Sequence, residues 1–149
     1  MTGRARLAND AWESLLTVHA TFMKSFAAEP IWGDVSMKEY DVLYALAKAG
    51  EPVRLTDLHQ RVLLSQPALS RMVERLVGRG LVARCEDAGD RRVVRLALTE
   101  TGRERQREVG RAHARDVAAA MTATGVGDAD LDELQRITRA LLGTKEKEQ

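Results

Sequence analysis

Residues 64–82 of this chain read LSQPALSRMVERLVGRGLV, and residues 90–102 read DRRVVRLALTETG. The first stretch predicts a helix that begins after Ser65, because serine is a favourable N-cap and proline, here Pro67, is tolerated in a first helical turn. Its apolar residues recur at intervals of three and four and so share one buried face: Leu69, Met72, Val73 and Leu76. The opposite face carries polar or small residues that we expect to be exposed: Pro67, Ser70, Arg71 and Glu74.

The segments on either side of this helix complete a recognisable unit. Residues 55–62 carry apolar positions on one face and predict a short helix, which is followed by a turn at 63–65. Residues 81–84 and 93–98 have β character and enclose the polar turn 86–92, so they predict a hairpin with a charged tip. Two helices joined by a tight turn and followed by a hairpin predict a winged helix-turn-helix, whose second helix fits the DNA major groove.

Further helices flank this unit. An apolar stripe predicts a helix over residues 7–28, and a capping box at Ser36 and Glu39 predicts a second helix that ends at Gly50. A long charged helix is expected from Thr99 to about residue 123, and a last one over residues 131–142. The expected fold is therefore mainly α with a small β-hairpin wing.

Composition limits the class of protein. The chain has 149 residues, a formal net charge of +1 and a single cysteine, so no intramolecular disulfide can form. The N-terminus lacks the apolar core of a secretory signal, and no run of apolar residues is long enough to span a membrane. We therefore expect a cytoplasmic protein that does not contact the membrane.

Charge is distributed unevenly along the chain. Residues 52–115 hold 14 arginines, no lysine and eight acidic residues, a net charge of +6, whereas the remainder carries −5. Arginine suits bidentate contacts to guanine edges and phosphates. All six aromatic residues precede residue 45, outside the basic region. Stacking on single strands needs aromatics among the basic residues, so this arrangement favours duplex DNA.

The two quoted stretches resemble the MarR family of winged-helix transcription regulators. Residues 64–82 look like its recognition helix, and Asp90, Arg92, Leu98, Thr99 and Gly102 match its wing signature D-x-R, five residues, L-T-x-x-G. The resemblance implies one domain over 1–149, with a winged helix-turn-helix at 35–102 and dimerisation helices at 1–34 and 103–149. From the residues alone, these amphipathic helices could instead pack within one chain. The resemblance also implies a homodimeric repressor that reads a pseudo-palindromic operator and responds to a small aromatic or phenolic effector.

The predicted DNA contacts come from the recognition helix and the wing. Side chains at the helix N-terminus and on its exposed face can reach phosphates or base edges, and wing arginines suit the minor groove. By resemblance, Asp90 braces one of the two wing arginines. Arg75 is lateral on the helix, and meets either phosphate or a neighbouring acid such as Glu74. The predicted DNA-binding set is Ser65, Gln66, Pro67, Ser70, Arg71, Arg75, Arg91 and Arg92.

An effector pocket is a second predicted site. The resemblance places it between the dimer helices and the winged helix, and the alternative for each of its residues is ordinary core packing. The candidates are His19, Phe22, Met23, Phe26, Tyr40 and Tyr44.

Other chemistry has less support. His59 stands where relatives have a small residue, so it either points outward or fills a local gap. Cys85 is expected to be a half-buried strand residue, with redox sensing as the alternative.

The histidines and the cysteine share no metal-ligand spacing, so no metal or cofactor is predicted. No nucleophile or phosphate-loop motif occurs, so we expect no enzyme. The remaining rival is a winged-helix protein–protein adaptor without DNA binding.

Overall fold

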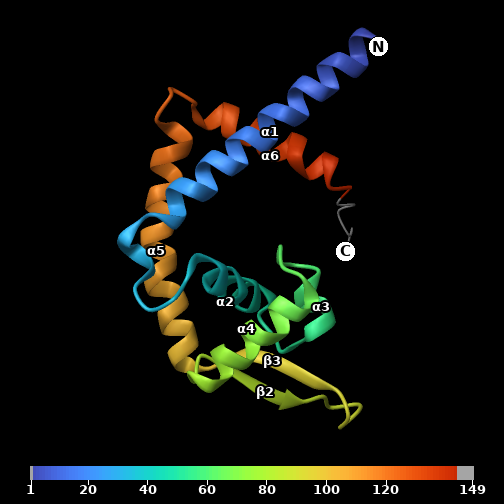
Figure 1. Cartoon of the computed structure of the whole chain (residues 1–149), viewed down its shortest axis with the longest axis vertical. Coiled ribbons are helices and arrows are strands. Elements are labelled where there is room, and N and C mark those ends of the chain that lie inside the picture. The colour runs from blue at the N-terminus through green and yellow to red at the C-terminus, as the bar shows by residue number, and fades with distance from the viewer. Residues whose placement is uncertain (1, 144–149) are drawn as a thin grey trace. The chain divides into compact units, whose positions relative to one another are not determined.

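The computed structural model describes residues 2–143, and its contacts divide the chain into two compact units. One unit ends at Ala114 and the other begins at Arg115, within a helix. In the first unit, helix α1 (Gly3–Ala27) is followed by the 3-10 turn η1 (Pro30–Trp32) and helix α2 (Met37–Ala49). Figure 1 shows these elements leading into a cluster of short helices and strands.

That cluster is the predicted winged helix-turn-helix. It consists of β1 (Val53–Arg54), α3 (Leu55–His59), α4 (Gln66–Gly78), β2 (Val82–Glu86) and β3 (Val94–Leu98). Figure 1 shows the β2–β3 hairpin extending beyond the helices of the cluster. Helix α5 (Glu100–Thr122) follows and crosses the boundary between the units, and α6 (Asp128–Leu141) belongs to the second unit. The predicted fold class is confirmed.

The described strands form one antiparallel sheet in the order β1-β3-β2. The hairpin pairs Val82 with Leu98 and Cys85 with Arg95, while β1 adds Arg54 on the other side of Arg95. Sequence analysis predicted only the two hairpin strands. It missed β1 because a two-residue strand carries no periodicity and exists only through its pairing.

Local signals in the sequence set the ends of α2 as expected. Ser36 Oγ accepts a hydrogen bond of 3.1 Å from the Glu39 backbone, and the Glu39 carboxylate accepts one of 3.0 Å from the Ser36 backbone. This is the predicted capping box. Gly50 ends the helix at φ 72°, in the left-handed region that glycine occupies without strain.

The predicted helix over residues 55–62 is wrong at its C-terminal end. Helix α3 stops at His59, and the backbone N–H of Arg61 bonds to Leu58 O at 2.9 Å in a tighter turn. His59 Nε2 lies 2.9 Å from the Leu64 carbonyl oxygen, so the half-buried imidazole bridges the turn. Of the two positions expected for His59, the structure shows the one that fills a local gap.

The hydrophobic core lies between α2, α3, α4 and the sheet. Leu43, Leu58, Leu69 and Leu76 are fully buried there, and Val82 is 2% exposed. The predicted inner face of α4 is confirmed, because Leu69, Met72, Val73 and Leu76 are all buried. This packing fixes which side of α4 faces solvent.

Helices α1 and α6 are amphipathic but carry uncovered apolar side chains. In α1 only Phe26 is buried, and Leu7 is 70% exposed. In α6, taken by itself, none of the described side chains is buried, and Leu141 is 70% exposed. None of the helices within residues 2–143 is both long and apolar enough to cross a membrane.

Candidate nucleic-acid interface

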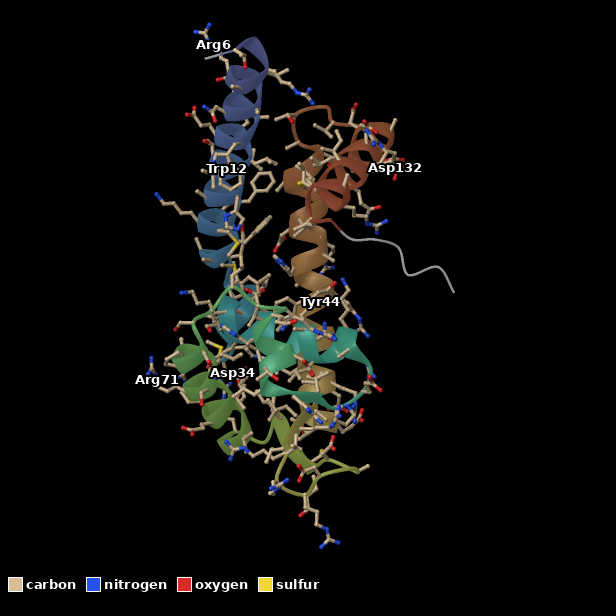
Figure 2. All side chains as sticks on the ribbon, turned by 90° about the vertical axis from the view of Figure 1, so that its right-hand side faces the viewer. Arg6, Trp12, Asp34, Tyr44, Arg71 and Asp132 are labelled. Atoms are coloured by element: carbon tan, nitrogen blue, oxygen red, sulfur yellow. The ribbon has the colours of Figure 1, made fainter. Side chains whose placement is uncertain are left out.

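Helix α4 presents the predicted contact residues at its N-terminus and along one side. Ser65 caps the helix, its Oγ accepting from the Ala68 backbone at 3.3 Å. Gln66 and Pro67 occupy the exposed first turn, and Ser70 is half-buried. Arg71 is exposed, and Figure 2 shows its side chain projecting away from the body of the first unit. An exposed helix N-terminus with polar side chains is suited to phosphate and base edges.

Arg75 has an acidic neighbour from another helix. Its Nε lies 3.9 Å from Glu39 Oε1, while its side chain stays 57% exposed. Of the alternatives for Arg75, the structure therefore pairs it with Glu39 of α2 rather than with Glu74. The guanidinium remains accessible enough to meet a phosphate as well.

Arg79, just after α4, connects the helix to the segment before α2. It donates to Glu39 Oε2 at 3.2 Å and to the Asp34 carbonyl oxygen at 2.8 Å. Asp34 also accepts a hydrogen bond from Arg105 of α5, and this bond is the main reason that the pKa of Asp34 lies below its usual value. Sequence reasoning missed this network, because its members are far apart in the chain.

The tip of the wing carries an internal ion pair. Asp90 Oδ1 accepts from the Arg92 backbone at 3.0 Å and from its Nε at 3.1 Å, and Oδ2 accepts from Nη2 at 3.2 Å. These bonds lower the pKa of Asp90. Arg92 is nevertheless 91% exposed, and Arg91 beside it is exposed too. The arginine that Asp90 braces is thus Arg92.

The base of the wing contains an acid that sequence analysis did not single out. Asp87 is 8% exposed, the one buried charged side chain among the residues that the structure describes. Its carboxylate accepts a hydrogen bond from Arg95 Nε, which is the main cause of its lowered pKa. The sequence signal was present as Asp-Ala-Gly in the turn, a pattern that favours a side chain bonded to the backbone two residues on.

The second half of the wing signature joins the sheet to α5. Thr99 Oγ1 donates to the Gly80 carbonyl at 2.6 Å and accepts from the Gly102 backbone at 2.9 Å. This confirms Thr99 as the N-cap of α5. A Cβ at Gly102 would overlap the Leu81 carbonyl oxygen, so only glycine fits this close approach. The motif therefore fixes α5 against the end of α4.

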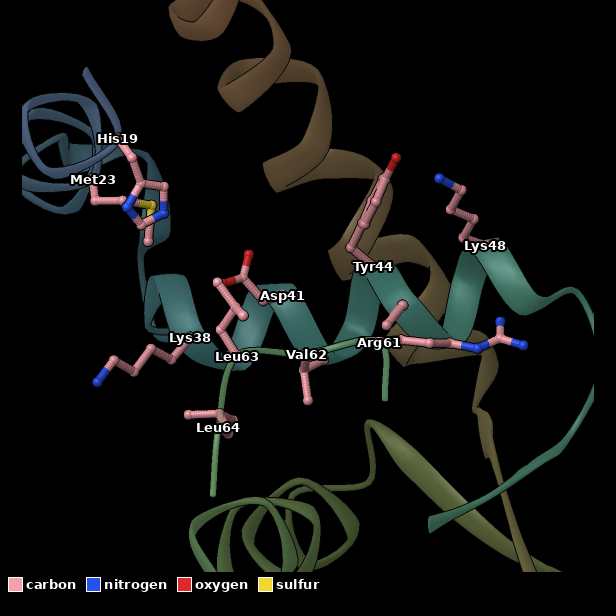
Figure 3. A pocket seen from close by; sticks show the side chains of 11 residues that line it. His19, Met23, Lys38, Asp41, Tyr44, Lys48, Arg61, Val62, Leu63 and Leu64 are labelled. Carbon is pink, nitrogen blue, oxygen red and sulfur yellow. The ribbon is translucent and has the colours of Figure 1, made fainter. Parts of the chain in front are cut away.

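A cavity of about 660 Å³ lies in the first unit, beside α2. Figure 3 shows side chains of α1, of α2 and of the turn after α3 around it. Of the six predicted effector residues, His19, Met23 and Tyr44 line the cavity. Its charged lining residues are Lys38, Asp41, Lys48 and Arg61. These charged residues were missed at the sequence level, because a polar residue on a helix usually faces solvent.

The other three predicted effector residues lie in an aromatic cluster. Phe26 and Tyr40 are buried and pack against His113 of α5, with ring centroids 5.1 and 5.6 Å apart. Phe22 packs against Phe26 in a tilted arrangement with ring centroids 5.6 Å apart, and Trp32 completes the cluster. These rings do not line the cavity, which corresponds to the core-packing alternative for them.

Cys85 is half-buried in β2, as expected. Within the described part of the chain, no three His, Cys, Asp or Glu side chains come together in a way that could hold a metal ion.

A helix-turn-helix whose second helix exposes an arginine face, followed by an arginine-tipped antiparallel hairpin, defines a winged helix-turn-helix protein. Residues 34–93 match the MarR family. This match confirms the MarR-family resemblance, and it covers α2, the helix-turn-helix and the wing as far as Val93.

Solved structures of MarR-type regulators are similar in fold over most of the chain. AbsC, a MarR family transcriptional regulator from Streptomyces coelicolor, is 26% identical with a TM-score of 0.74, over 97% of this chain and 98% of that one. A mutant of MarR from E. coli, complexed with operator DNA, is 19% identical with a TM-score of 0.73, over 87% and 91%. NadR in complex with 4-hydroxyphenylacetate is 23% identical with a TM-score of 0.74, over 89% and 92%. Among curated proteins, no sequence matched.

Proposed function

We propose that this chain is a sequence-specific, double-stranded DNA-binding regulator of transcription. It acts in the cytoplasm as a homodimeric repressor that reads a pseudo-palindromic operator, and a small aromatic or phenolic molecule controls it. The observation that carries the DNA-binding part is that α4 has one buried apolar face and one exposed polar face. One face is locked into the core by Leu69 and Leu76, so the opposite face presents Arg71 to solvent.

The wing supports the same interpretation. Arg91 and Arg92, the latter braced by Asp90, are exposed at the tip of the wing. Arginine side chains in this position suit a narrow DNA minor groove, whose negative potential attracts them. The E. coli MarR mutant, which has the same fold, was solved with operator DNA. Helix α4 then supplies contacts in the major groove and the wing supplies contacts in the minor groove.

Selection of random duplexes by the purified protein, followed by sequencing, tests this function. We expect enriched duplexes with two related half-sites whose centres are separated by roughly 34–36 Å, one turn of DNA. Affinity for them should fall steeply with salt. The logarithm of the binding constant should decrease by about 0.9 per unit of log salt concentration for each phosphate neutralised. No enriched duplex together with a flat salt response would contradict the proposal and favour a protein–protein adaptor.

Homodimer formation rests on the uncovered apolar side chains of the outer helices. In α1, Trp12 is 59% exposed and Val18 is 52% exposed, and Figure 2 shows Trp12 on α1 above the winged helix. In α6, Ile137 is 42% exposed. Several large apolar side chains exposed on one helix are typical of a surface that becomes buried in an interface, and this holds for α1 and for α6 separately. Light scattering coupled to size exclusion should give twice the chain mass at micromolar concentration, and a stable monomer would contradict the dimer.

The effector part of the proposal rests on the cavity beside α2. Tyr44 offers a ring for stacking, and Lys38, Lys48 and Arg61 provide positive charge for a carboxylate. NadR, of the same fold, was solved with 4-hydroxyphenylacetate.

A thermal-shift series with phenolic acids tests the cavity. Binding to the folded state raises the unfolding temperature as ligand occupancy rises. We expect Lys48→Ala to reduce the shift, and Lys24→Ala, exposed on α1 outside the cavity, to leave it unchanged. Equal shifts in both variants would place the binding elsewhere, and no shift with any acid would contradict this effector class.

A further inference from the structure

The wing loop closes around one buried carboxylate. Asp87 Oδ2 accepts hydrogen bonds of 3.1 Å from the backbone N–H groups of both Gly89 and Asp90. The Asp87 backbone N–H donates to the Val93 carbonyl oxygen at 3.1 Å. The loop between β2 and β3 is therefore organised from its inside by the Asp87 side chain.

The same carboxylate fastens the loop to the rest of the sheet. Arg95 of β3 donates its Nε to Asp87 Oδ1 and its Nη1 to the Pro52 carbonyl oxygen, the latter at 3.1 Å. Arg54 of β1 adds a longer ion pair at 3.9 Å. Hydrogen bonds from Arg95 and from the loop backbone hold the pKa of Asp87 below its usual value, so the carboxylate is charged at neutral pH.

These contacts form a continuous connection from Pro52, the residue before β1, to the wing tip. It runs from Pro52 through Arg95 and Asp87 to Asp90, which in turn holds Arg92. An isolated two-stranded hairpin is only marginally ordered in water. A hairpin whose tip is fixed in advance loses less conformational entropy when it binds.

We propose that Asp87 is a positioning residue for DNA binding, which presents Arg91 and Arg92 to the minor groove by fixing the wing loop to β3 and β1. The inference rests on the proposed function. Asp87 itself is buried and negative, so it gains nothing from phosphate contact and acts through the two arginines.

A simple charge argument predicts that loss of Asp87 has the opposite effect on DNA affinity, so the experiment can distinguish the two explanations. Removing a negative charge from a wing that approaches phosphates should leave DNA affinity unchanged or strengthen it. The exposed neighbour Glu86 provides this matched control, because Glu86→Gln removes a charge at the adjacent position without touching the loop bonds. We expect Asp87→Asn to weaken binding to the selected duplex by about tenfold, equivalent to about 1.4 kcal/mol, and Glu86→Gln to leave it equal or tighter.

A double-mutant cycle separates positioning from a general effect on folding. In a protein that already carries Arg91→Ala and Arg92→Ala, Asp87→Asn should cause no further loss, because the side chains it positions are gone. The salt slope of the Asp87→Asn variant should fall to that of the double arginine variant. A full additional loss in this background would overturn the proposal.

A second variant covers the case in which Asp87→Asn fails to fold. Arg95→Lys keeps the positive charge but cannot donate simultaneously to Asp87 and Pro52 in the same planar arrangement. It should show the same roughly tenfold loss. Parent-like affinity in Arg95→Lys, or in a folded Asp87→Asn, overturns this inference alone, whereas failure of the parent protein to select any duplex overturns the proposed function.

Discussion

Glu39 and Arg79, forty positions apart in the sequence, form a charged hydrogen bond of 3.2 Å that joins the first turn of α2 to the C-terminal end of α4. The same Glu39 carboxylate closes the capping box on Ser36. One side chain thus contacts both the start of α2 and the C-terminal end of α4. Its own exposure is only 12%, so solvent screens these bonds less than at an open surface.

Loss of the Glu39 carboxylate should therefore destabilise the winged helix. We expect Glu39→Ala to lower the free energy of unfolding by about 1–3 kcal/mol, because it leaves charged and backbone donors unpaired. Urea unfolding followed by circular dichroism measures this. Glu74→Ala, exposed on α4, is the matched control and should change stability by less than about 0.5 kcal/mol. A stability loss for Glu39→Ala as small as that for Glu74→Ala would show that the Glu39 contacts contribute no stability.

Gly102 should tolerate no side chain. A Cβ there meets the Leu81 carbonyl oxygen, part of the backbone, so relief requires α5 to shift away from the end of α4. We expect Gly102→Ala to cost about 1–3 kcal/mol or more, measured as a lowered unfolding temperature. Gly78→Ala, in α4 where an added Cβ would meet no other atom within 4 Å, should instead stabilise by about 0.5–1 kcal/mol. The two substitutions are therefore expected to change stability in opposite directions, and an unchanged stability of Gly102→Ala would contradict this prediction.

Arg71 should contribute to reading the operator. Truncation to alanine is expected to cost about 1–3 kcal/mol on the selected duplex and to relax preference at one base position of each half-site. Fluorescence anisotropy on the selected duplex and on single-base variants measures both effects. Arg111→Ala, exposed on α5, removes the same charge away from α4 and serves as the control. A uniform loss over all duplexes would assign Arg71 to phosphate contact instead.

Acidification should destabilise the fold through its paired aspartates. The pKa values of Asp34 and Asp87 are lowered in the folded protein, mainly by hydrogen bonds from Arg105 and Arg95. Their stabilising contribution is therefore complete above the unfolded value of 3.8 and is lost as pH falls through the folded values. Unfolding temperatures measured from about pH 5 to 2 should decline, and Asp34→Asn should lessen the decline.

Asp41 provides a control of opposite sign. Partial desolvation beside the cavity raises its pKa, against the attraction of His113. Protonation of Asp41 therefore favours the folded state, and Asp41→Asn should not lessen the acid-induced decline. A smaller decline in Asp41→Asn than in Asp34→Asn would show that the signs have been assigned wrongly.

Most of the fold follows from local patterns in the chain. Apolar spacing predicted α4 and its buried face, and Ser65, Ser36 with Glu39, Gly50 and Thr99 marked helix ends that the structure confirms. Such signals act within four residues, so they can be recognised without knowledge of tertiary structure. The end of α3 was misplaced because the backbone enters a tighter turn at Arg61, and the accompanying contact between His59 and the Leu64 carbonyl spans five residues.

The candidate sites were predicted less completely. Exposed positions such as Arg71 could be placed, because helical periodicity assigns a face to each residue. The residues predicted to line an effector pocket lie in two places instead: Tyr44 lines the cavity, whereas Phe26 belongs to the aromatic cluster. Both rings lie on amphipathic helices, and spacing alone does not distinguish packing against a neighbour from lining a space.

The sequence by itself determined the class of protein: a winged helix-turn-helix with an arginine-rich DNA face, because periodicity, caps and turn residues act locally. Tertiary structure alone decided which charges far apart in the chain are paired. Asp87 meets Arg95, and Glu39 meets Arg79, through strand pairing and helix packing that bring distant positions together. The physical reason is range: backbone preferences extend over about one helical turn, whereas an ion pair requires proximity in space, whatever the separation along the chain.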